Sequence, residues 1–234
     1  MQHRVSVKAK LGATPLDAAF TLSAPWTVLF GPSGCGKTSL LRAMGGVLRG
    51  ADVSFARCEG DAAWVELSKK APDCRSLAYA PQAGVIFPHL TVAENVGFPY
   101  RVCQDPPKQS SQMDEAMSLF ALHSLAERMP KELSGGERQR VSLARAFAVP
   151  GACLILLDEP FAGLDRARRD ELLPAMKAWC EEKRVQVLSV THDVDEALLL
   201  GAEVVRIEMG KVLAQGPVRE VLAVERERML QSLG

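Results

Sequence analysis

Long apolar runs are missing from this sequence, and so is any excess of charge of one sign. Its most apolar stretch, Ala152 to Leu157, is far shorter than the roughly 20 residues that a membrane-spanning helix needs. Lysine and arginine together number 28, as do aspartate and glutamate, so no net field attracts nucleic acid or anionic lipid. We therefore expect neither a membrane span nor a dedicated nucleic-acid binder.

Cysteines are few, and an apolar leader is lacking. The six cysteines are scattered without a C-x-x-C pair, which is typical of reduced thiols rather than of a disulfide framework or a zinc site. Residues Met1 to Val5 lack the apolar run of a signal peptide. These absences predict a cytoplasmic protein, so any transport function would need another chain to cross the membrane.

Short apolar runs alternate with amphipathic stretches along the 234 residues. We expect strands at 5–8, 18–22, 26–30, 76–81, 153–157, 186–190, 204–208 and 211–215. We expect helices at 37–48, 138–149, 166–183 (kinked at Pro174) and 194–200, and a mostly helical stretch over 91–130 with a loop near 105–107. The region before Lys70 is polar and weakly patterned. The alternation predicts an α/β fold with a mainly parallel sheet flanked by helices, an antiparallel N-terminal part and a smaller helical subdomain.

A glycine-rich stretch directly after the strand at 26–30 fits the pattern G-x-x-x-x-G-K-[ST]. In such a loop, backbone N–H groups and the positive end of the following helix hold phosphates. Lys37 should bridge the β- and γ-phosphates, and the Thr38 hydroxyl should bind Mg²⁺. The alternative, a turn that binds nothing, does not explain three glycines and a Lys-Thr pair at fixed offsets. The predicted nucleotide contacts are Gly31, Pro32, Ser33, Gly34, Cys35, Gly36, Lys37, Thr38 and Ser39.

Two acids, Asp158 and Glu159, follow the apolar strand at 153–157. Ligands of open parallel sheets bind at the carboxyl ends of strands. We expect Asp158 to hold Mg²⁺ through water and Glu159 to act as the general base toward the attacking water. A cap on a loop or helix is the alternative for these acids. Together with the phosphate loop they indicate a P-loop nucleotidase, and no guanine-reading N-K-x-D segment is present.

The stretch Ser134-Gly135-Gly136-Glu137 precedes an amphipathic helix and predicts a second anion-binding helix start. One chain has only one phosphate loop, so this second site suits a nucleotide held by another copy. Alternatively, Ser134 and Glu137 form a capping box on an ordinary helix. That alternative leaves the two glycines unexplained.

The run from Leu133 to Arg140 resembles the signature of ABC ATPases, and the resemblance covers essentially the whole chain. It implies a P-loop NTPase with ATP and Mg²⁺, a RecA-like core at 1–90 and 151–234, and a helical subdomain at about 91–150. It further implies a dimer that holds ATP between protomers, formed by two copies or with a different ATPase.

In this resemblance Gln82 is the Q-loop residue that senses Mg²⁺ and the γ-phosphate, Asp165 lies in the D-loop that contacts the opposite protomer, and His192 is the switch histidine. A lone histidine or glutamine is more often structural. The family's usual N-terminal aromatic residue for adenine is lacking, because Phe20 fits a core strand better. Apolar residues such as Val5 or Leu11 would then contact the base.

Residues 87–96, Phe-Pro-His-Leu-Thr-Val-Ala-Glu-Asn-Val, resemble the segment of bacterial import ATPases that receives a helix of the membrane permease. From composition alone these residues would be ordinary core. Weaker similarities favour molybdate-type importers, without the C-terminal sensing domain of that type. Importers of sulfate, iron, sugar or polyamine and an ABC exporter are the alternatives.

Within this reading the partners are permease subunits and, indirectly, a substrate-binding protein, and the chain lies on the inner face of the membrane. A soluble ABC ATPase acting on DNA or ribosomes usually has coiled-coil inserts or two cassettes, which this sequence lacks. A P-loop kinase would have no use for Leu133 to Glu137.

Overall fold

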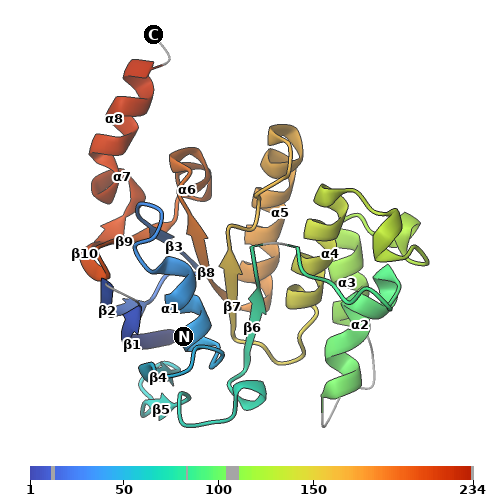
Figure 1. Cartoon of the computed structure of the whole chain (residues 1–234), viewed down its shortest axis with the longest axis horizontal. Coiled ribbons are helices and arrows are strands. Elements are labelled where there is room, and N and C mark those ends of the chain that lie inside the picture. Colours follow the sequence, from blue (N-terminus) through green and yellow to red (C-terminus); the bar gives the residue numbers. More distant parts are fainter. Residues whose placement is uncertain (12–13, 83, 104–110, 233–234) are drawn as a thin grey trace. The chain divides into compact units, whose positions relative to one another are not determined.

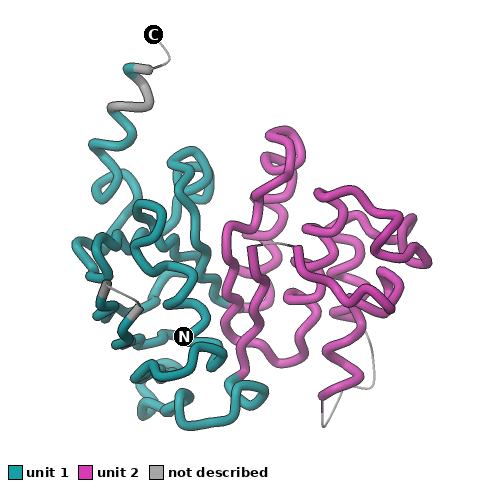
Figure 2. The backbone as a smooth tube through the Cα atoms, in the orientation of Figure 1, with its two compact units in different colours: residues 1–75, 186–234 teal, residues 76–185 magenta. Residues whose placement is uncertain are grey.

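The computed structural model describes residues 1–11, 14–82, 84–103 and 111–232 (Figure 1). The predicted loop near 105–107 lies outside these ranges. The contacts divide the chain into two compact units, residues 1–75 with 186–234 (unit 1) and residues 76–185 (unit 2) (Figure 2). In the described ranges, no helix combines the length and apolarity that crossing a membrane requires.

Unit 1 is built on eight strands in the order β5-β4-β1-β2-β10-β9-β3-β8. β3 runs parallel to β8 and β9, whereas β1 is antiparallel to both β2 and β4. The strands are β1 (Gln2–Leu11), β2 (Thr14–Leu22), β3 (Trp26–Phe30), β4 (Asp52–Cys58), β5 (Val65–Glu66), β8 (Gln186–Thr191), β9 (Glu203–Glu208) and β10 (Lys211–Pro217). The helices are α1 (Lys37–Met44), the short η1 (Pro72–Cys74), α6 (Val194–Leu200), α7 (Val218–Val221) and α8 (Ala223–Ser232).

The core of unit 1 follows from strand composition. β8 is buried throughout, and Val28 and Leu29 of β3 are fully buried, as continuous apolar runs in parallel strands require. β1 instead alternates, with Val5 and Val7 buried and Lys8 exposed, so only one face of the antiparallel part is covered.

Unit 2 combines a parallel pair of strands with a group of helices. β6 (Leu77–Ala80) pairs with β7 (Leu154–Asp158) in a register that sets Ala80 opposite Leu157. The helices are α2 (Val92–Val102), α3 (Ser111–Leu119), η2 (His123–Leu125), η3 (Pro130–Glu132), α4 (Gly135–Phe147) and α5 (Arg166–Lys183). α4 packs against α2, α3 and both strands, and the rings of Phe120 and Phe147 meet edge to face at 5.2 Å.

The fold class predicted from the sequence is confirmed, since the chain has parallel strands, flanking helices and an antiparallel N-terminal part. β3, α5 and α6 have the predicted bounds, and α5 continues through Pro174. Other elements differ in extent: the first helix ends at Met44 instead of Leu48, the first two strands begin earlier than predicted, and the helix predicted at 138–149 is α4, Gly135–Phe147. The region before Lys70, for which no element was predicted, contains β4 and β5. The division at about 91 and 150 stays a prediction.

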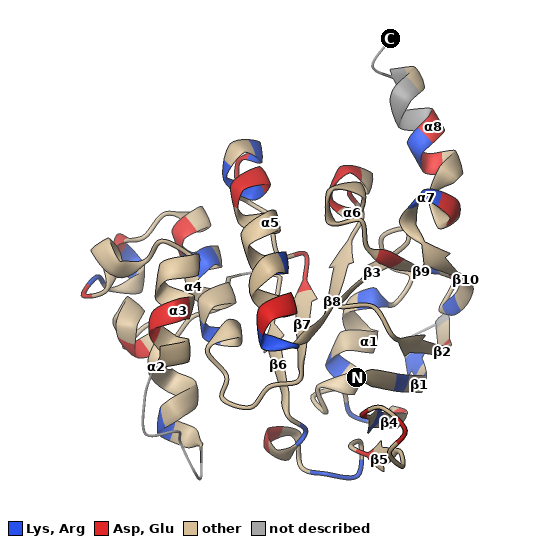
Figure 3. Cartoon of the chain, turned by 180° about the vertical axis from the view of Figure 1, so that it is seen from behind, with Lys and Arg blue, Asp and Glu red and all other residues tan. Residues whose placement is uncertain are grey.

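The helices α5 and α8 each carry charged residues of both signs, whereas α3 carries only acidic ones (Figure 3). All six cysteines are free thiols. Both observations agree with the balanced charge and with the reading of unpaired thiols.

A buried histidine joins two distant segments of unit 1. His3 is fully buried on β1, its ring stacks on Phe55, and its Nδ1 lies 2.7 Å from Oε1 of Gln186. The Gln186 amide in turn donates to the Ala24 carbonyl at 2.9 Å. Burial lowers the pKa of His3 from its ordinary value of 6.5 to about 4.

Acid should therefore weaken the fold through His3. Between pH 6.5 and 4 the unfolded chain binds a proton that the folded chain excludes, so the free energy of unfolding falls as pH decreases, by up to roughly 3 kcal/mol. His3→Leu should remove that part of the pH dependence. Urea unfolding of both proteins at pH 7 and pH 4.5 measures it; an unchanged difference between the two pH values in His3→Leu would contradict the assignment.

Candidate functional site

The loop between β3 and α1 has a backbone that favours glycine at three positions. Gly34 and Gly36 have φ angles of 79° and 103°, in the left-handed region. A Cβ on Gly31 would lie 2.0 Å from the Ile207 carbonyl oxygen, so any side chain would force the loop away from β9. The predicted phosphate motif thus has the local geometry that its glycines imply.

The start of α1 is open to an anion. Gly36 offers no side-chain cap, and the first turn contains no acidic residue, so neither competes for the helix's free N–H groups. Lys37 is buried, and its ammonium donates to the carbonyls of Gly31 at 2.7 Å and Pro32 at 2.9 Å. It also lies 3.9 Å from the Cys35 sulfur. Of the other predicted contacts, Pro32, Ser33 and Gly34 are exposed, Cys35 is buried, and Gly36, Thr38 and Ser39 are partly exposed.

In unit 2 the predicted carboxylates end β7. Asp158 is 1% exposed, and the Tyr79 hydroxyl donates to its Oδ2 at 3.3 Å. Glu159 has a φ of 47°, a conformation that costs a residue with a side chain about 1–3 kcal/mol. Gln82 donates from Nε2 to the Glu159 carboxylate at 2.8 Å. Two residues predicted from separate motifs are thereby brought into direct contact.

The strand register explains this contact. Ala80 lies opposite Leu157 in the parallel pair, and Gln82 and Glu159 each come two residues later. Both side chains therefore emerge at the same end of the two strands, where ligands of parallel sheets bind. Tyr79 of β6, to which no role was assigned from the sequence, donates its hydroxyl hydrogen bond to Asp158 at the end of β7.

The start of α4 contains the capping box that was the alternative reading of the Ser-Gly-Gly-Glu stretch. Ser134 accepts from the Glu137 N–H at 3.2 Å, and the Glu137 carboxylate accepts from the Ser134 N–H at 2.7 Å. The pKa of Glu137 is lowered chiefly by the hydrogen bond from the Ser134 backbone N–H and, to a smaller extent, by the Ser134 side chain. A Cβ on Gly136 would lie 3.2 Å from the Leu164 side chain, so packing accounts for that glycine.

Gly135 has no such explanation within the chain. A Cβ there would meet nothing within 4 Å, and its φ is not in the left-handed region. Ser134 and Gly135 are both exposed. The helix start is consequently accessible, and the lack of a side chain at Gly135 serves no contact with the described residues.

The remaining predicted residues lie beside helix starts. Asp165 is exposed and caps α5 by accepting from the Arg168 N–H at 2.9 Å. In unit 1, His192 is exposed and directly follows β8. Hydrogen bonds fix its neighbours Thr191 and Asp193. The Thr191 hydroxyl donates to a Glu196 carboxylate oxygen at 2.6 Å and accepts from the Asp193 N–H at 3.0 Å. The backbone on both sides of His192 is thus held in place.

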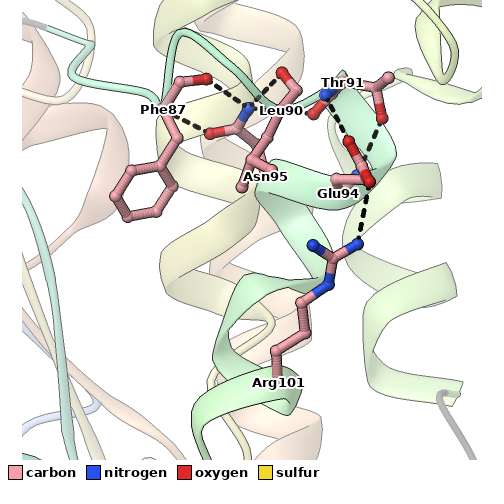
Figure 4. Close-up of polar contacts among 6 residues, drawn as sticks. All are labelled: Phe87, Leu90, Thr91, Glu94, Asn95 and Arg101. Atoms are coloured by element: carbon pink, nitrogen blue, oxygen red, sulfur yellow. Dashed lines mark hydrogen bonds and ion pairs between the residues drawn. The ribbon is translucent and has the colours of Figure 1, made fainter.

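The side-chain amide of Asn95 fixes residues 87–91, which belong to the segment that resembles a permease-docking surface (Figure 4). Asn95 is fully buried; its Oδ1 accepts from the Phe87 N–H at 2.7 Å, and its Nδ2 donates to the carbonyls of Phe87, Leu90 and Thr91 at 3.1, 3.0 and 2.9 Å. Leu90 is buried, whereas Pro88 is exposed. An asparagine between the apolar residues Val92 and Val96 on the buried face of α2 is the sequence signal that could have indicated this role.

The expectation for adenine was wrong for Val5, which is fully buried in the sheet and out of reach of a ligand. The side chain of Leu11 lies outside the described residues. Phe20 is 6% exposed and is a core residue, as predicted. Among the described residues, no cluster of three or more His, Cys, Asp or Glu could hold a metal ion alone.

A family model described as "ABC transporter" matches residues 17–162, more than half of the chain. The chain belongs to the ABC transporter family. Proteins named "Molybdenum import ATP-binding protein ModC" are similar to it: that of Pseudomonas savastanoi pv. phaseolicola is 42% identical over 84% of this chain and 54% of its own length. The ModC protein of Methylococcus capsulatus is 41% identical over 84% of this chain and 54% of its own length.

The ModC of Rhodopseudomonas palustris (strain HaA2) is 38% identical over 93% of this chain and 58% of its own length, so the chain spans about half the length of the curated relatives it matches. A solved structure titled "Dimeric Structure of MJ0796, a Bacterial ABC Transporter Cassette" has a TM-score of 0.78, covers 94% of this chain and 99% of its own, and is 23% identical. That likeness confirms the predicted ABC-cassette fold. ATP binding is what membership of the family implies.

Proposed function

We propose that this chain is the ATP-binding and ATP-hydrolysing subunit of an ABC importer. The observation that carries the proposal is the phosphate loop, where an uncapped helix start and the buried Lys37 meet in a backbone that favours glycine at three positions. These groups suit a polyphosphate, because N–H donors, the helix dipole and an ammonium all favour concentrated negative charge. The import function is supported by the names of the ModC relatives.

Mg²⁺ fits the oxygen donors that the motifs supply. Thr38, Asp158 and Gln82 offer a hydroxyl, a buried carboxylate and an amide oxygen, all of the hard type that Mg²⁺ prefers. Because Gln82 donates to Glu159 through its nitrogen, its oxygen is left for a metal. The ion would supply charge neutralisation on the phosphates.

In the proposed reaction, Lys37 and the N–H groups of the loop hold the β- and γ-phosphates. Glu159 takes a proton from water as the water oxygen attacks the γ-phosphorus, and the bond to the β-phosphate oxygen breaks to give ADP and phosphate. His192 and Gln82 stabilise the charge on the transferred group. The Gln82–Glu159 hydrogen bond orients the carboxylate for this role.

We further propose that two copies, or this chain and a second ATPase, close on the nucleotide. Ser134, Gly135, Gly136, Glu137 and Asp165 would face the nucleotide of the other protomer. Gly135 supports this, because it is exposed and a Cβ there would meet none of the described residues, which leaves room for a nucleotide of the other protomer. Closure on ATP and opening after hydrolysis would couple the nucleotide to a membrane partner, since one ligand then joins two surfaces in only one state.

Pairing gives a direct test. Glu159→Gln, saturated with Mg·ATP, should elute as a dimer in size-exclusion chromatography with light scattering. Adding Gly135→Glu should weaken pairing at least about tenfold, because a carboxylate would then face the phosphates, with ATP affinity and unfolding midpoint unchanged. Gly135→Ala should still pair. If Gly135→Glu pairs as well as its parent, the helix start does not contact the second nucleotide.

For cargo, we propose molybdate or a related oxyanion, on the strength of the relatives' names. Import of sulfate, iron, sugar or polyamine, or export, would require the same ATPase chemistry. The partners are then permease subunits, which would place the chain at the inner face of the cell membrane, and indirectly a substrate-binding protein. Molybdate uptake by cells lacking the gene, with and without the restored chain, tests this choice.

A further inference from the structure

Tyr79 of β6 contacts the buried carboxylate that ends β7. Its hydroxyl donates to Oδ2 of Asp158 at 3.3 Å, and Asp158 is 1% exposed. Taking an ionised carboxylate out of water is costly unless hydrogen-bond donors replace the water. Each donor that reaches Asp158 therefore matters for the charge that this residue can keep, and Tyr79 supplies one such donor from the neighbouring strand.

The strand register determines where this hydroxyl lies. Tyr79 pairs with Leu156 in the parallel ladder of β6 and β7, and paired residues share one face of a sheet. Asp158 comes two residues after Leu156, so it lies on the same face, one step further along the sheet. Ala80 continues the ladder after Tyr79. The hydroxyl is thus carried by paired backbone, which limits its motion relative to the carboxylate.

A hydroxyl is a suitable partner for a carboxylate that also has to serve a metal ion. It donates a hydrogen bond without adding positive charge, so the negative charge of Asp158 is kept for a cation. A carboxylate has two oxygens with about four acceptor positions in all, and Tyr79 occupies one position on Oδ2. A lysine or arginine in the place of Tyr79 would instead neutralise the carboxylate.

Satisfying a buried acid for the sake of folding is the alternative role of this hydroxyl. At 3.3 Å, however, the bond is longer than the roughly 2.7–2.8 Å that hydroxyl donors prefer, so it contributes little stability by itself. A phenylalanine ring would pack in the sheet equally well. What the hydroxyl adds is direction, because it restricts the rotation of the Asp158 carboxylate, and a ligand already held in one orientation loses less entropy when a metal ion binds.

We infer that Tyr79 is a positioning residue for Mg²⁺, which holds the Asp158 carboxylate in the orientation that serves the ion. The inference rests on the proposed function, in which Asp158 binds Mg²⁺ through water. Tyr79 acts only through Asp158 and touches neither the nucleotide nor the ion. Hydrogen-bond partners of metal ligands typically change metal affinity by roughly 10–100-fold, and the length of this bond places the expected effect at about five- to tenfold.

The test replaces the hydroxyl and keeps the ring, as Tyr79→Phe does. The affinity of the whole chain for a fluorescent, non-hydrolysable ATP analogue is titrated in EDTA and again in excess Mg²⁺. In EDTA, Tyr79→Phe should bind within about twofold of the unaltered chain, whereas in Mg²⁺ it should bind about five- to tenfold more weakly. Tyr100→Phe, the same change at the chain's other tyrosine, on α2, should match the unaltered chain in both titrations.

The comparison of the two titrations separates positioning from folding. A hydroxyl that served only the fold would weaken binding equally with and without Mg²⁺, and that result overturns the inference, as does unchanged binding in both titrations. Tyr79→Met also lacks the hydroxyl and should show the same loss confined to Mg²⁺, so the inference remains testable if Tyr79→Phe folds poorly.

The kinetics supply a second measurement. In Tyr79→Phe, the Mg²⁺ concentration that half-saturates ATP hydrolysis should rise about five- to tenfold, with turnover at saturating Mg²⁺ within about twofold of the original. A fall in turnover that saturating Mg²⁺ does not restore contradicts the positioning role. The inference also falls if Mg²⁺ does not strengthen binding of the analogue to the unaltered chain. If that chain binds the analogue in neither condition, the proposed function itself fails.

Discussion

Lys37→Ala should lose ATP affinity by at least about 100-fold. The ammonium is the one side-chain cation fixed in the phosphate loop, and hydrogen bonds to charged groups contribute about 1.5–3 kcal/mol each, so loss of contacts to two phosphates accounts for a change of this size. Titration with a fluorescent ATP analogue measures the affinity. Lys69→Ala, which removes an exposed lysine of the same unit, is the matched control.

Folding must be measured alongside, because Lys37 also holds the carbonyls of Gly31 and Pro32 in its own loop. The unfolding midpoint should fall only slightly, since the two carbonyls belong to one loop, in which Pro32, Ser33 and Gly34 are exposed, and most of the core is elsewhere. An affinity within twofold of the original chain would remove the phosphate-binding assignment.

Glu159→Gln should keep ATP affinity and lose turnover by roughly 10²–10⁴-fold, the usual contribution of a positioned base. The substitution retains an oxygen that can accept from Gln82, so the 2.8 Å hydrogen bond and the local backbone should persist. Only the ability to take a proton is removed. Phosphate release under saturating ATP gives the turnover.

Glu182→Gln is the control for this change, because it makes the same replacement of a carboxylate by an amide at an exposed position on α5. Its turnover should equal that of the original chain. Should Glu159→Gln hydrolyse ATP at more than about a third of the original rate, another group must serve as the base.

Much of the site could be predicted because its information is local. The phosphate loop needs glycine where the backbone enters the left-handed region or where a Cβ would lie 2.0 Å from a carbonyl oxygen, and those glycines occur at fixed spacing. The contact of Gln82 with Glu159 could also be anticipated, since two parallel strands of matching register end beside each other. Apolar period and caps together set the bounds of α5 and α6.

What escaped prediction depends on partners far away in the sequence. β4 mixes polar and apolar residues and is held by pairing with β1 and by Glu66, whose carboxylate accepts from the Ser54 hydroxyl and from the Phe55 N–H. No pattern within residues 50–70 records those partners. Likewise Arg145 is an ordinary helical arginine until the fold brings the Phe87 ring beneath it.

The left-handed backbone of Glu159 sets a limit on what selection can improve. Glycine would adopt that conformation without strain, so a screen for heat resistance alone would favour losing the carboxylate, and with it the proposed chemistry. Evolution toward robustness and evolution toward catalysis therefore pull in opposite directions at this one position. Thermostable versions of this chain should be sought through substitutions elsewhere, with residue 159 held constant.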